Sequence, residues 1–363
     1  MKVLITYVSA GAGHRKAAEA IYNFLKENRQ DLDLKLVDAL PFASPVFRFC
    51  YNWGYPFLVH YAAWLWGFFF WITEFGLTRW LSRKMAILSN YFSCRKFVKY
   101  LKEEEFDYII STHFLNSELA ANLKQKNKIR SKLVTVITDF GVHPFWVSFG
   151  TDIYIAASGL IKEALLKMGV EEGQIKVTGI PFSPDFNKVH DRNRLADKFG
   201  IAADKFTVMV MTGSFGCGPL DEIAGELCDE VQVLVVCAEN KRLFKRLKNK
   251  AYPNVKVFGF IDNVDELMAV SDCLITKPGG SSIAELLDVG LVPIFITAIP
   301  GQEADNVKIL STYGVGFAPK NIKQIRELVI DLKNDPGKLK NLRNNIKAIA
   351  RPSACREIAD VIR

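Results

Sequence analysis

The stretch "VSAGAGHRKAAEAI" (residues 8–21) decides how the beginning of this chain is expected to fold. An apolar run, "KVLITYVS" (2–9), leads into its glycines, and a helical pattern follows them. A strand, a glycine turn and a helix in this order are typical of the first unit of a doubly wound α/β sheet. The turn ends in His14 and Arg15, however, where a dinucleotide-binding loop has a third glycine and a P-loop has Lys followed by Ser or Thr. The stretch therefore predicts an α/β domain whose first loop carries an unusual polar pair.

The rest of the chain repeats this alternation of short apolar runs and helical patterns. The runs are at residues 2–9, 32–39, 106–112, 132–138, 152–158, 206–214, 231–238, 254–260, 272–279 and 291–297. Short β-rich runs separated by helices indicate parallel sheets that are covered on both faces. Because 363 residues are more than one core usually holds, the sequence predicts an α/β fold with two Rossmann-like doubly wound domains in series.

The limits of the two domains follow from a change in composition. The stretch "FNKVHDRNRLADKFGIAADK" (186–205) is polar and has no apolar run, so it indicates the join. We expect a first domain over residues 1–188, a second over 189–345, and a carboxyl-terminal helix within 346–363 that packs back on the first domain.

Composition restricts the environment and the partners. The chain has 49% hydrophobic and 24% charged residues, which describes a globular protein. Its seven cysteines show no CxxC pair or other metal-ligand spacing, and this indicates buried thiols in a reducing compartment. The first apolar run leads into a glycine turn instead of a cleavage site, so we expect a cytoplasmic location. The net charge of +8 suggests an anionic partner: a nucleic acid, a membrane surface or a phosphorylated substrate.

An aromatic-rich insertion over residues 41–100 interrupts the first domain. Sixteen of the 43 aromatic residues and five of the six tryptophans lie between Pro41 and Trp80, and no charged residue occurs from Phe49 to Thr73. This length suits a transmembrane helix, but a single crossing would put runs 2–9 and 132–138 of one sheet on opposite sides of the membrane. A monotopic membrane contact fits better. The alternatives are an aromatic core helix pair or a dimer interface.

The residues expected at the bilayer are large aromatics of this insertion. They are Trp53, Trp64, Trp66, Phe69, Phe70, Trp71 and Trp80. Basic residues follow closely, at Arg79, Arg83, Lys84, Arg95, Lys96 and Lys99. Each such charge gains about 1 kcal/mol near an anionic lipid surface. We therefore expect a peripheral protein on the cytoplasmic face of the cell membrane.

Three loops of the second half follow strand-like runs, where open α/β sheets bind ligands. "MTGSFGCGPLDE" (211–222) places glycines before a helix, which suits a diphosphate. "TKPGGSSIAELLDVG" (276–290) combines backbone amides and two serines with Glu285, a carboxylate suited to ribose hydroxyls. "PGQEADN" (300–306) offers polar side chains for sugar hydroxyls. Each loop taken singly is equally explained by helix capping, but three together favour a sugar-nucleotide site.

These loops and the glycine–His–Arg turn, at this spacing, resemble the monogalactosyldiacylglycerol synthase and processive diacylglycerol glucosyltransferase family. The resemblance extends to "ITDFGVHPFWVS" (137–148), "VTGIPFSPDF" (177–186) and "VCAEN" (236–240), although that family often has glycine where Ala238 stands. It implies the GT-B architecture, in which two Rossmann-like domains face a central cleft. The chain is similar, more distantly, to the lipid-linked N-acetylglucosaminyl transferase of peptidoglycan synthesis.

The resemblance also implies a reaction and a set of site residues. A hexose would pass from UDP-glucose or UDP-galactose to diacylglycerol, with inversion to a β-glycoside. By position, Glu285 would bind ribose, the backbone of Phe260 and Ile261 would pair with uracil, and two loops would meet the diphosphate. Those loops carry Gly213, Ser214, Gly216, Gly279, Gly280, Ser281 and Ser282. The sugar would contact Gln302, Glu303 and Asn306.

An inverting transfer needs a base that takes the proton of the acceptor hydroxyl. His14 is the first candidate, because the dipole at a helix N-terminus favours neutral imidazole. Asp139 is a second base candidate or a group that orients the acceptor or His14. Gly13, Arg15 and His143 are expected on the acceptor or phosphate side of the site.

No metal and no other cofactor is expected. Asp31-Leu32-Asp33 is the only Asp-x-Asp match, and it lies before its strand, at the wrong end for a sugar-nucleotide metal. Helix dipoles and backbone amides would take the place of the ion. The anionic partners would then be the sugar nucleotide and membrane lipids, with no nucleic acid. The rival hypotheses are the peptidoglycan transferase reaction, a UDP-sugar 2-epimerase, and a lipid-binding protein without activity.

Overall fold

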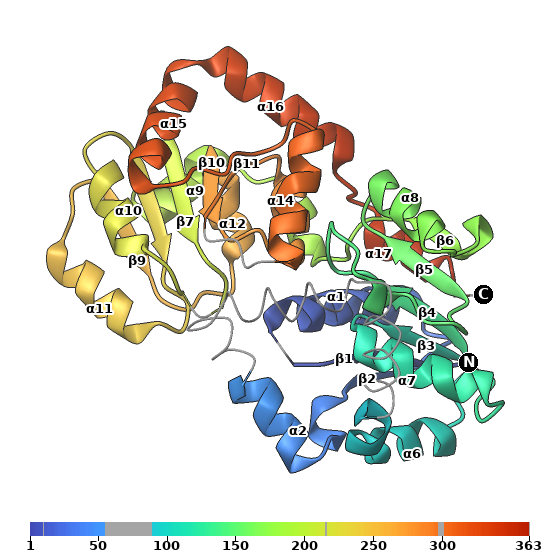
Figure 1. Cartoon of the computed structure of the whole chain (residues 1–363). Coiled ribbons are helices and arrows are strands. Elements are labelled where there is room, and N and C mark those ends of the chain that lie inside the picture. The colour runs from blue at the N-terminus through green and yellow to red at the C-terminus, as the bar shows by residue number, and fades with distance from the viewer. Residues whose placement is uncertain (10, 55–88, 215, 297–300, 363) are drawn as a thin grey trace. The chain divides into compact units, whose positions relative to one another are not determined.

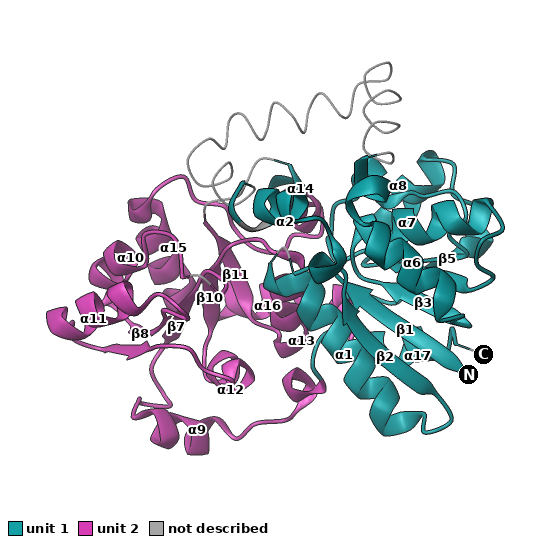
Figure 2. Cartoon of the chain, turned by 90° about the horizontal axis from the view of Figure 1, so that it is seen from below, with its two compact units in different colours: residues 1–183, 299–305, 353–363 teal, residues 184–298, 306–352 magenta. Residues whose placement is uncertain are grey.

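The computed structural model describes residues 1–9, 11–54, 89–214, 216–296 and 301–362. These residues form two units (Figures 1 and 2). Unit 1 consists of residues 1–183, 299–305 and 353–363, and unit 2 of residues 184–298 and 306–352. Of the side chains predicted to contact a membrane, only Trp53 lies within the described residues. Those outside them are Trp64, Trp66, Phe69, Phe70, Trp71 and Trp80.

Unit 1 contains one fully parallel sheet with the strand order β2-β1-β3-β4-β5-β6. The strands are β1 (Lys2–Tyr7), β2 (Asp33–Asp38), β3 (Tyr108–Ser111), β4 (Lys132–Val136), β5 (Ile153–Ala156) and β6 (Ile175–Val177). Within the described residues of this unit, the α-helices are α1 (Ala12–Asn28), α2 (Pro45–Phe49), α6 (Arg95–Glu103), α7 (Phe114–Gln125), α8 (Gly159–Lys167) and α17 (Ala354–Ala359).

Alternate side chains of each strand enter different cores, because a strand presents its residues to opposite faces in turn. Val3 and Ile5 of β1 pack in a cluster with α1 and α17, which includes Ile21. Leu4, between them, packs on the other face with α6 and α7, in a cluster that includes Phe97. Both faces of the sheet are therefore covered, which explains why its strands read as nearly continuous apolar runs.

Unit 2 contains a second parallel sheet with the order β11-β10-β7-β8-β9. The strands are β7 (Thr207–Met211), β8 (Gln232–Val236), β9 (Val255–Phe258), β10 (Cys273–Thr276) and β11 (Val292–Phe295). The helices are α9 (Arg192–Phe199), α10 (Leu220–Leu227), α11 (Lys241–Lys250), α12 (Val264–Ala269), α13 (Gly280–Val289), α14 (Gln302–Thr312), α15 (Ile322–Asn334) and α16 (Pro336–Ile349). Residues 302–305 of α14 are counted with unit 1. Two parallel α/β sheets in series confirm the predicted fold class.

Each sheet has a point at which the chain stops adding strands on one side of its first strand and continues on the other side. In unit 1 the order passes from β1 outward to β2 and then back to β3, which lies on the other side of β1. In unit 2 it passes from β7 through β8 to β9 and then back to β10. Ligands of open α/β sheets bind at the carboxyl ends of the strands at such points. The loops after β1 and β3, and those after β7 and β10, are thus the places to look for a site.

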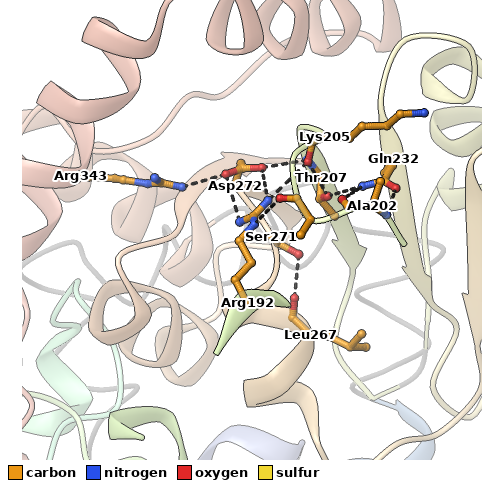
Figure 3. Close-up of polar contacts among 10 residues, drawn as sticks. Arg192, Ala202, Lys205, Thr207, Gln232, Leu267, Ser271, Asp272 and Arg343 are labelled. Carbon is orange, nitrogen blue, oxygen red and sulfur yellow. Dashed lines mark hydrogen bonds and ion pairs between the residues drawn. The ribbon is translucent and has the colours of Figure 1, made fainter. Parts of the chain in front are cut away.

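The opposite, amino-terminal edge of the unit 2 sheet is closed by polar contacts (Figure 3). Asp272, just before β10, accepts hydrogen bonds from the backbone N–H of Thr207 at 2.9 Å, Arg192 Nη2 at 3.0 Å and Arg343 Nη2 at 3.2 Å. Gln232, at the start of β8, accepts from Ala202 N at 2.7 Å and donates to Ala202 O at 2.8 Å. These contacts tie α9 and α16 to the sheet.

Candidate active site

His14 lies in the first turn of α1, directly after β1. Gly11 precedes the helix with φ of 129°, a backbone conformation that side chains disfavour, and this brings the helix sharply out of the strand. His14 Nδ1 lies 2.7 Å from the carbonyl oxygen of Thr112, which follows β3, and 2.9 Å from Thr138 Oγ1, which follows β4. A carbonyl only accepts, so Nδ1 carries the proton and the lone pair is on Nε2. The loops of three adjacent strands therefore fix the form of the ring that a base needs.

The environment of His14 also keeps it neutral. Burial lowers the pKa of the ring to about 4, and the bond to the carbonyl of Thr112 opposes this effect only in part. The imidazole is thus unprotonated at neutral pH. The helix dipole was the expected cause of the neutral ring, whereas in the structure burial is the main cause.

His113 was missed by the sequence analysis and lies against His14. The two ring centroids are 4.6 Å apart in an edge-on arrangement. His113 Nδ1 accepts a hydrogen bond from Leu115 N at 3.1 Å and caps α7, so its proton is on Nε2. Burial and the neighbouring His14 hold the pKa of His113 well below its usual value. Its position directly after the apolar run 106–112 was the available signal, since parallel strands end at the same edge.

The loop after β4 carries Asp139 and meets the beginning of α14. Asp139 Oδ2 accepts a hydrogen bond from Gln302 Nε2 at 3.2 Å. At Gly141 an added Cβ would lie 2.6 Å from the Cβ of Asp305, so this approach leaves no room for a side chain. The structure thus brings Asp139, a predicted base candidate, together with Gln302, a residue predicted to contact the sugar. Glu303 lies beside Gln302 in the same helical turn.

The residues assigned to the acceptor side have differing surroundings. His143 is buried, and its Nδ1 accepts from Phe145 N at 3.3 Å, so it caps the short helix Pro144–Trp146. Arg15 is exposed, and its Nε lies 3.6 Å from Glu19 Oε1 one helical turn later. Gly13 lies in the first turn of α1 beside His14. Of these, His143 already has a structural role in the free protein.

The loop after β7 in unit 2 depends on glycine. Gly213, Gly216 and Gly218 have φ values of 78°, 54° and 125°, all in the range that favours glycine. At Gly216 an added Cβ would lie 2.2 Å from the carbonyl oxygen of Cys237, which no side chain can tolerate. Ser214 O accepts from Glu239 N at 3.1 Å. The loop is therefore packed closely on the loop after β8.

The loop after β10 leads into α13 with no side-chain cap. Gly279 is the N-cap residue and, as a glycine, provides no side-chain cap for the N–H groups of the first turn. The N–H groups at the start of a helix can bind an anion. Ser281 and Glu285 are buried in this helix, and Ser282 is half-buried. Gly280, its first residue, has no side chain to obstruct an anion.

Two threonines mark the ends of the strands on either side of this switch point. Thr212 follows β7 and Thr276 ends β10, and their side chains are only 5% and 1% exposed. Neither hydroxyl has a hydrogen-bond partner among the described residues. A buried polar group without a partner costs stability. Asn306 is also fully buried, but its Nδ2 donates to Pro278 O at 2.9 Å and supports the same loop.

A cavity of about 520 Å³ opens beside these loops in unit 2. Its lining residues come from the loops after β8 and β9 and from α11: Ala238, Glu239, Lys241, Phe244, Gly259 and Phe260. Phe260 is 65% exposed, and Ile261 follows it. Ala238 has φ of 47°, a left-handed conformation, which is the physical reason a glycine suits that position. The cavity volume lies in the range of small-molecule sites.

No group of three or more His, Cys, Asp or Glu side chains within the described ranges is arranged to hold a metal ion. Asp31 of the only Asp-x-Asp match pairs with Arg29 at 2.8 Å, before β2 begins. The pair therefore lies at the amino-terminal edge, away from the loops described above.

Comparison with known proteins agrees with this fold. Residues 14–182 match the family described as monogalactosyldiacylglycerol (MGDG) synthase, and residues 207–348 match the glycosyltransferase family 28 C-terminal domain. The chain is 28% identical to a processive diacylglycerol beta-glucosyltransferase of Bacillus pumilus, over 96% of this chain and 91% of that protein. It is 32% identical to a probable chloroplastic monogalactosyldiacylglycerol synthase of Glycine max, over 97% of this chain and 69% of that protein.

A solved structure shows the same architecture. MurG of Acinetobacter baumannii superposes with a TM-score of 0.64 and 13% identity, over 99% of both chains. The fold is thus that of the GT-B glycosyltransferases. Within that class, the chain belongs to the family of monogalactosyldiacylglycerol synthases and processive diacylglycerol glucosyltransferases.

Proposed function

We propose that the protein transfers a hexose, glucose or galactose, from a UDP-sugar to the hydroxyl of diacylglycerol and produces a β-glycosyl diacylglycerol. The observation that carries this proposal is the state of His14. The ring is neutral, its Nδ1 proton is bound to Thr112 O at 2.7 Å, and its Nε2 lone pair is left for the proton of an acceptor hydroxyl. Family membership supports the choice of substrates.

The proposed reaction is a single displacement. His14 Nε2 removes the proton of the acceptor hydroxyl as its oxygen bonds to the anomeric carbon, and the bond from that carbon to the diphosphate oxygen breaks. UDP leaves with the electron pair. The N–H groups at the start of α13 and the glycine loop after β7 would stabilise the added negative charge. Asp139, held by Gln302, would orient the acceptor or His14.

The remaining contacts are proposed from the positions of the loops. Uracil would enter the cavity lined by Phe260 and pair with the backbone of Phe260 and Ile261, and Glu285 would bind the ribose. The diphosphate would meet Gly213, Ser214, Gly216, Gly279, Gly280, Ser281 and Ser282. The hexose would contact Gln302, Glu303 and Asn306. Because these backbone groups can replace a divalent ion, we propose that no metal is required.

Access to the acceptor would come from contact with a bilayer. In α2 and the π-helical turn Cys50–Gly54 that follows it, Val46, Phe49 and Trp53 are 74%, 65% and 71% exposed. Their spacing of three and four residues puts them on one helical face. Phe47 and Tyr51 face inward and stack at 4.9 Å. Within the ranges that the structure describes, no helix has the length and apolar character needed to span a membrane. We propose peripheral binding to anionic lipid on the cytoplasmic face of the cell membrane.

The decisive experiment is product analysis with the full chain. Purified protein is incubated with diacylglycerol vesicles and labelled UDP-glucose or UDP-galactose in turn, in excess chelator, and the lipids are separated by thin-layer chromatography. We expect label in a neutral glycolipid. Label that appears only in a diphosphate-linked lipid, when a polyprenyl diphosphate is supplied, would favour the peptidoglycan-type reaction. A change of the sugar without any lipid product would favour an epimerase.

Vesicle sedimentation tests the membrane contact separately. Replacing Phe49 and Trp53 by Ser removes two large apolar side chains from the exposed face, and we expect binding to anionic vesicles to fall by at least about tenfold. Val189→Ser, at a fully exposed apolar residue of unit 2, is the matched control and should leave binding unchanged. Equal binding of the double variant and the wild type would show that this face does not meet the bilayer.

A further inference from the structure

Asn240 makes two side-chain hydrogen bonds at the junction of two ligand-site loops in unit 2. Its Oδ1 accepts from Leu243 N at 3.0 Å and caps α11, while its Nδ2 donates to Gly216 O at 3.0 Å. The two partners determine the orientation of the amide, because the reversed amide would direct N–H at N–H and oxygen at oxygen.

The bond to Gly216 is one of a pair that holds the glycine loop. Glu239 N donates to Ser214 O at 3.1 Å, so consecutive residues of the loop after β8 bind the carbonyl oxygens of Ser214 and Gly216. Steric contact adds to this restraint, since a Cβ at Gly216 would lie 3.1 Å from the Cβ of Asn240. The position of the glycine loop is therefore set by the loop after β8, and not by its own sequence alone.

The residues next to Asn240 in the sequence line the cavity. Ala238, Glu239, Lys241 and Phe244 line it, and the helix that Asn240 caps carries the last two. One side chain thus connects the cavity proposed for the nucleobase with the loop proposed for the diphosphate. A nucleotide bound in the cavity meets its phosphate-binding N–H groups only if the loop is held at the right distance from it.

We propose that Asn240 is a positioning residue, which holds the glycine loop after β7 in register with the nucleobase cavity so that a nucleoside diphosphate contacts both. This inference rests on the proposed UDP-sugar site and deepens it. It predicts that loss of the Nδ2 donor weakens recognition of the phosphates and spares recognition of the nucleoside.

Two substitutions separate the two bonds of Asn240. Asn240→Asp and Asn240→Ser both retain a good N-cap acceptor for α11, and both lose the amide donor to Gly216 O. By titration calorimetry on the full chain, we expect the Kd of UDP to rise about tenfold in both variants. The Kd of uridine should stay within about twofold of wild type. The KM for the UDP-sugar should rise with the Kd of UDP, while kcat changes less.

Asn321 supplies the matched control. It caps α15 by accepting a hydrogen bond from Gln324 N at 2.9 Å. Asn321→Asp and Asn321→Ser repeat the chemical changes at another helix of unit 2 and should leave both Kd values unchanged. Thermal unfolding of all four variants reports any general loss of the fold.

The outcomes distinguish this inference from the proposed function. If the wild type binds neither uridine nor UDP, the UDP-sugar site is wrong and the inference falls with it. If the wild type binds UDP and Asn240→Ser binds it equally well, only the role of Asn240 is wrong. A deficit in Asn240→Asp alone would show charge repulsion of the phosphates and would also overturn the proposal. Equal losses for uridine and UDP would show that Asn240 only stabilises the fold.

Discussion

The two edges of the unit 2 sheet are built in opposite ways. At the amino-terminal edge, Asp272 is bound by two arginines and a backbone N–H, and Gln232 makes paired bonds to Ala202. At the carboxyl-terminal edge, the loops are glycine turns, α13 begins without a side-chain cap, and the hydroxyls of Thr212 and Thr276 have no partner among the described residues. The amino-terminal edge is closed by internal hydrogen bonds, while the carboxyl-terminal edge carries the polar groups that we propose to contact a ligand.

Unit 1 shows the same contrast between its edges. Near the amino-terminal ends of its strands, Glu104 binds Lys2 at 2.7 Å and Lys35 at 2.6 Å, and these bonds lower the pKa of Glu104 to about 2. Near the carboxyl-terminal ends, His14 and His113 are held neutral by burial. Charge pairs thus lie at the edge where the sheet is closed, and neutral histidines with a lowered pKa lie at the edge where the reaction is proposed.

The largest expected effect is a loss of catalytic rate when His14, at the carboxyl-terminal edge of the unit 1 sheet, is replaced. Removing a general base typically costs 10²–10⁴-fold in rate, so His14→Ala should lower kcat by about that factor. Its unfolding free energy should fall by about 1–3 kcal/mol, because the hydrogen bond to Thr112 O and the ring contact with His113 are lost, and urea unfolding should still show a folded protein at the assay temperature. His190→Ala, at a histidine of unit 2 whose Nε2 lies 3.2 Å from Asp265 Oδ2, is the control and should keep full kcat. Wild-type turnover of His14→Ala would refute the base assignment.

On the amino side, the expected loss is of stability and not of binding. Asp272→Asn removes a buried negative charge that faces two arginines, which should lower the unfolding free energy by about 2–3 kcal/mol. Urea unfolding measures this as a lower midpoint at constant slope. The exposed pair of Asp331 with Lys338 at 2.6 Å provides the comparison, and Asp331→Asn should cost below about 1 kcal/mol. A strong loss of UDP affinity in folded Asp272→Asn would contradict the division of roles.

The pH dependence of activity tests whether neutral His14 acts as the base. If neutral His14 is the base, kcat/KM should be nearly constant from pH 7 to about 5 and then fall about tenfold per pH unit below the pKa of about 4. A limb near pH 6.5 would instead indicate a solvent-exposed histidine.

Stability should follow the same groups. The folded protein binds fewer protons at His14 than the unfolded chain does, because the folded pKa is lowered from 6.5 to about 4. With respect to this group, the free energy of unfolding is therefore highest above pH 6.5, and it decreases as the pH falls towards 4. Urea unfolding of His14→Ala should show a weaker dependence on pH in this window. An unchanged dependence would contradict the burial of the ring.

The smallest expected effect concerns backbone strain at the carboxyl edge. Ala238 and Ala251 have φ values of 47° and 45°, and each should gain about 0.5–1 kcal/mol of stability on replacement by Gly, since glycine adopts this conformation without strain. Thermal unfolding measures both gains. Ala251, which caps the far end of α11, serves as the control. A gain at Ala251 without one at Ala238 would show that the binding loop relaxes in another way.

The fold class and the positions of several candidate site residues were determined by the sequence alone. The alternation of apolar runs with helices predicted two parallel α/β sheets, and the residues after the runs included His14, the glycines after β7 and the start of α13. These features are local: a strand, its turn and the next helix are specified by neighbouring residues, and parallel strands present their carboxyl ends at one edge.

The tertiary structure decided the rest, because it depends on contacts between distant parts of the chain. Thr112 lies 98 residues from His14, yet its carbonyl selects the tautomer of that ring. Burial, which no single segment determines, lowers the pKa of His14 and His113. Asn240 gains its proposed role only because two loops, separated by a strand and a helix, pack together at Gly216. Proton positions and loop registers follow from such partners, and no local pattern specifies them.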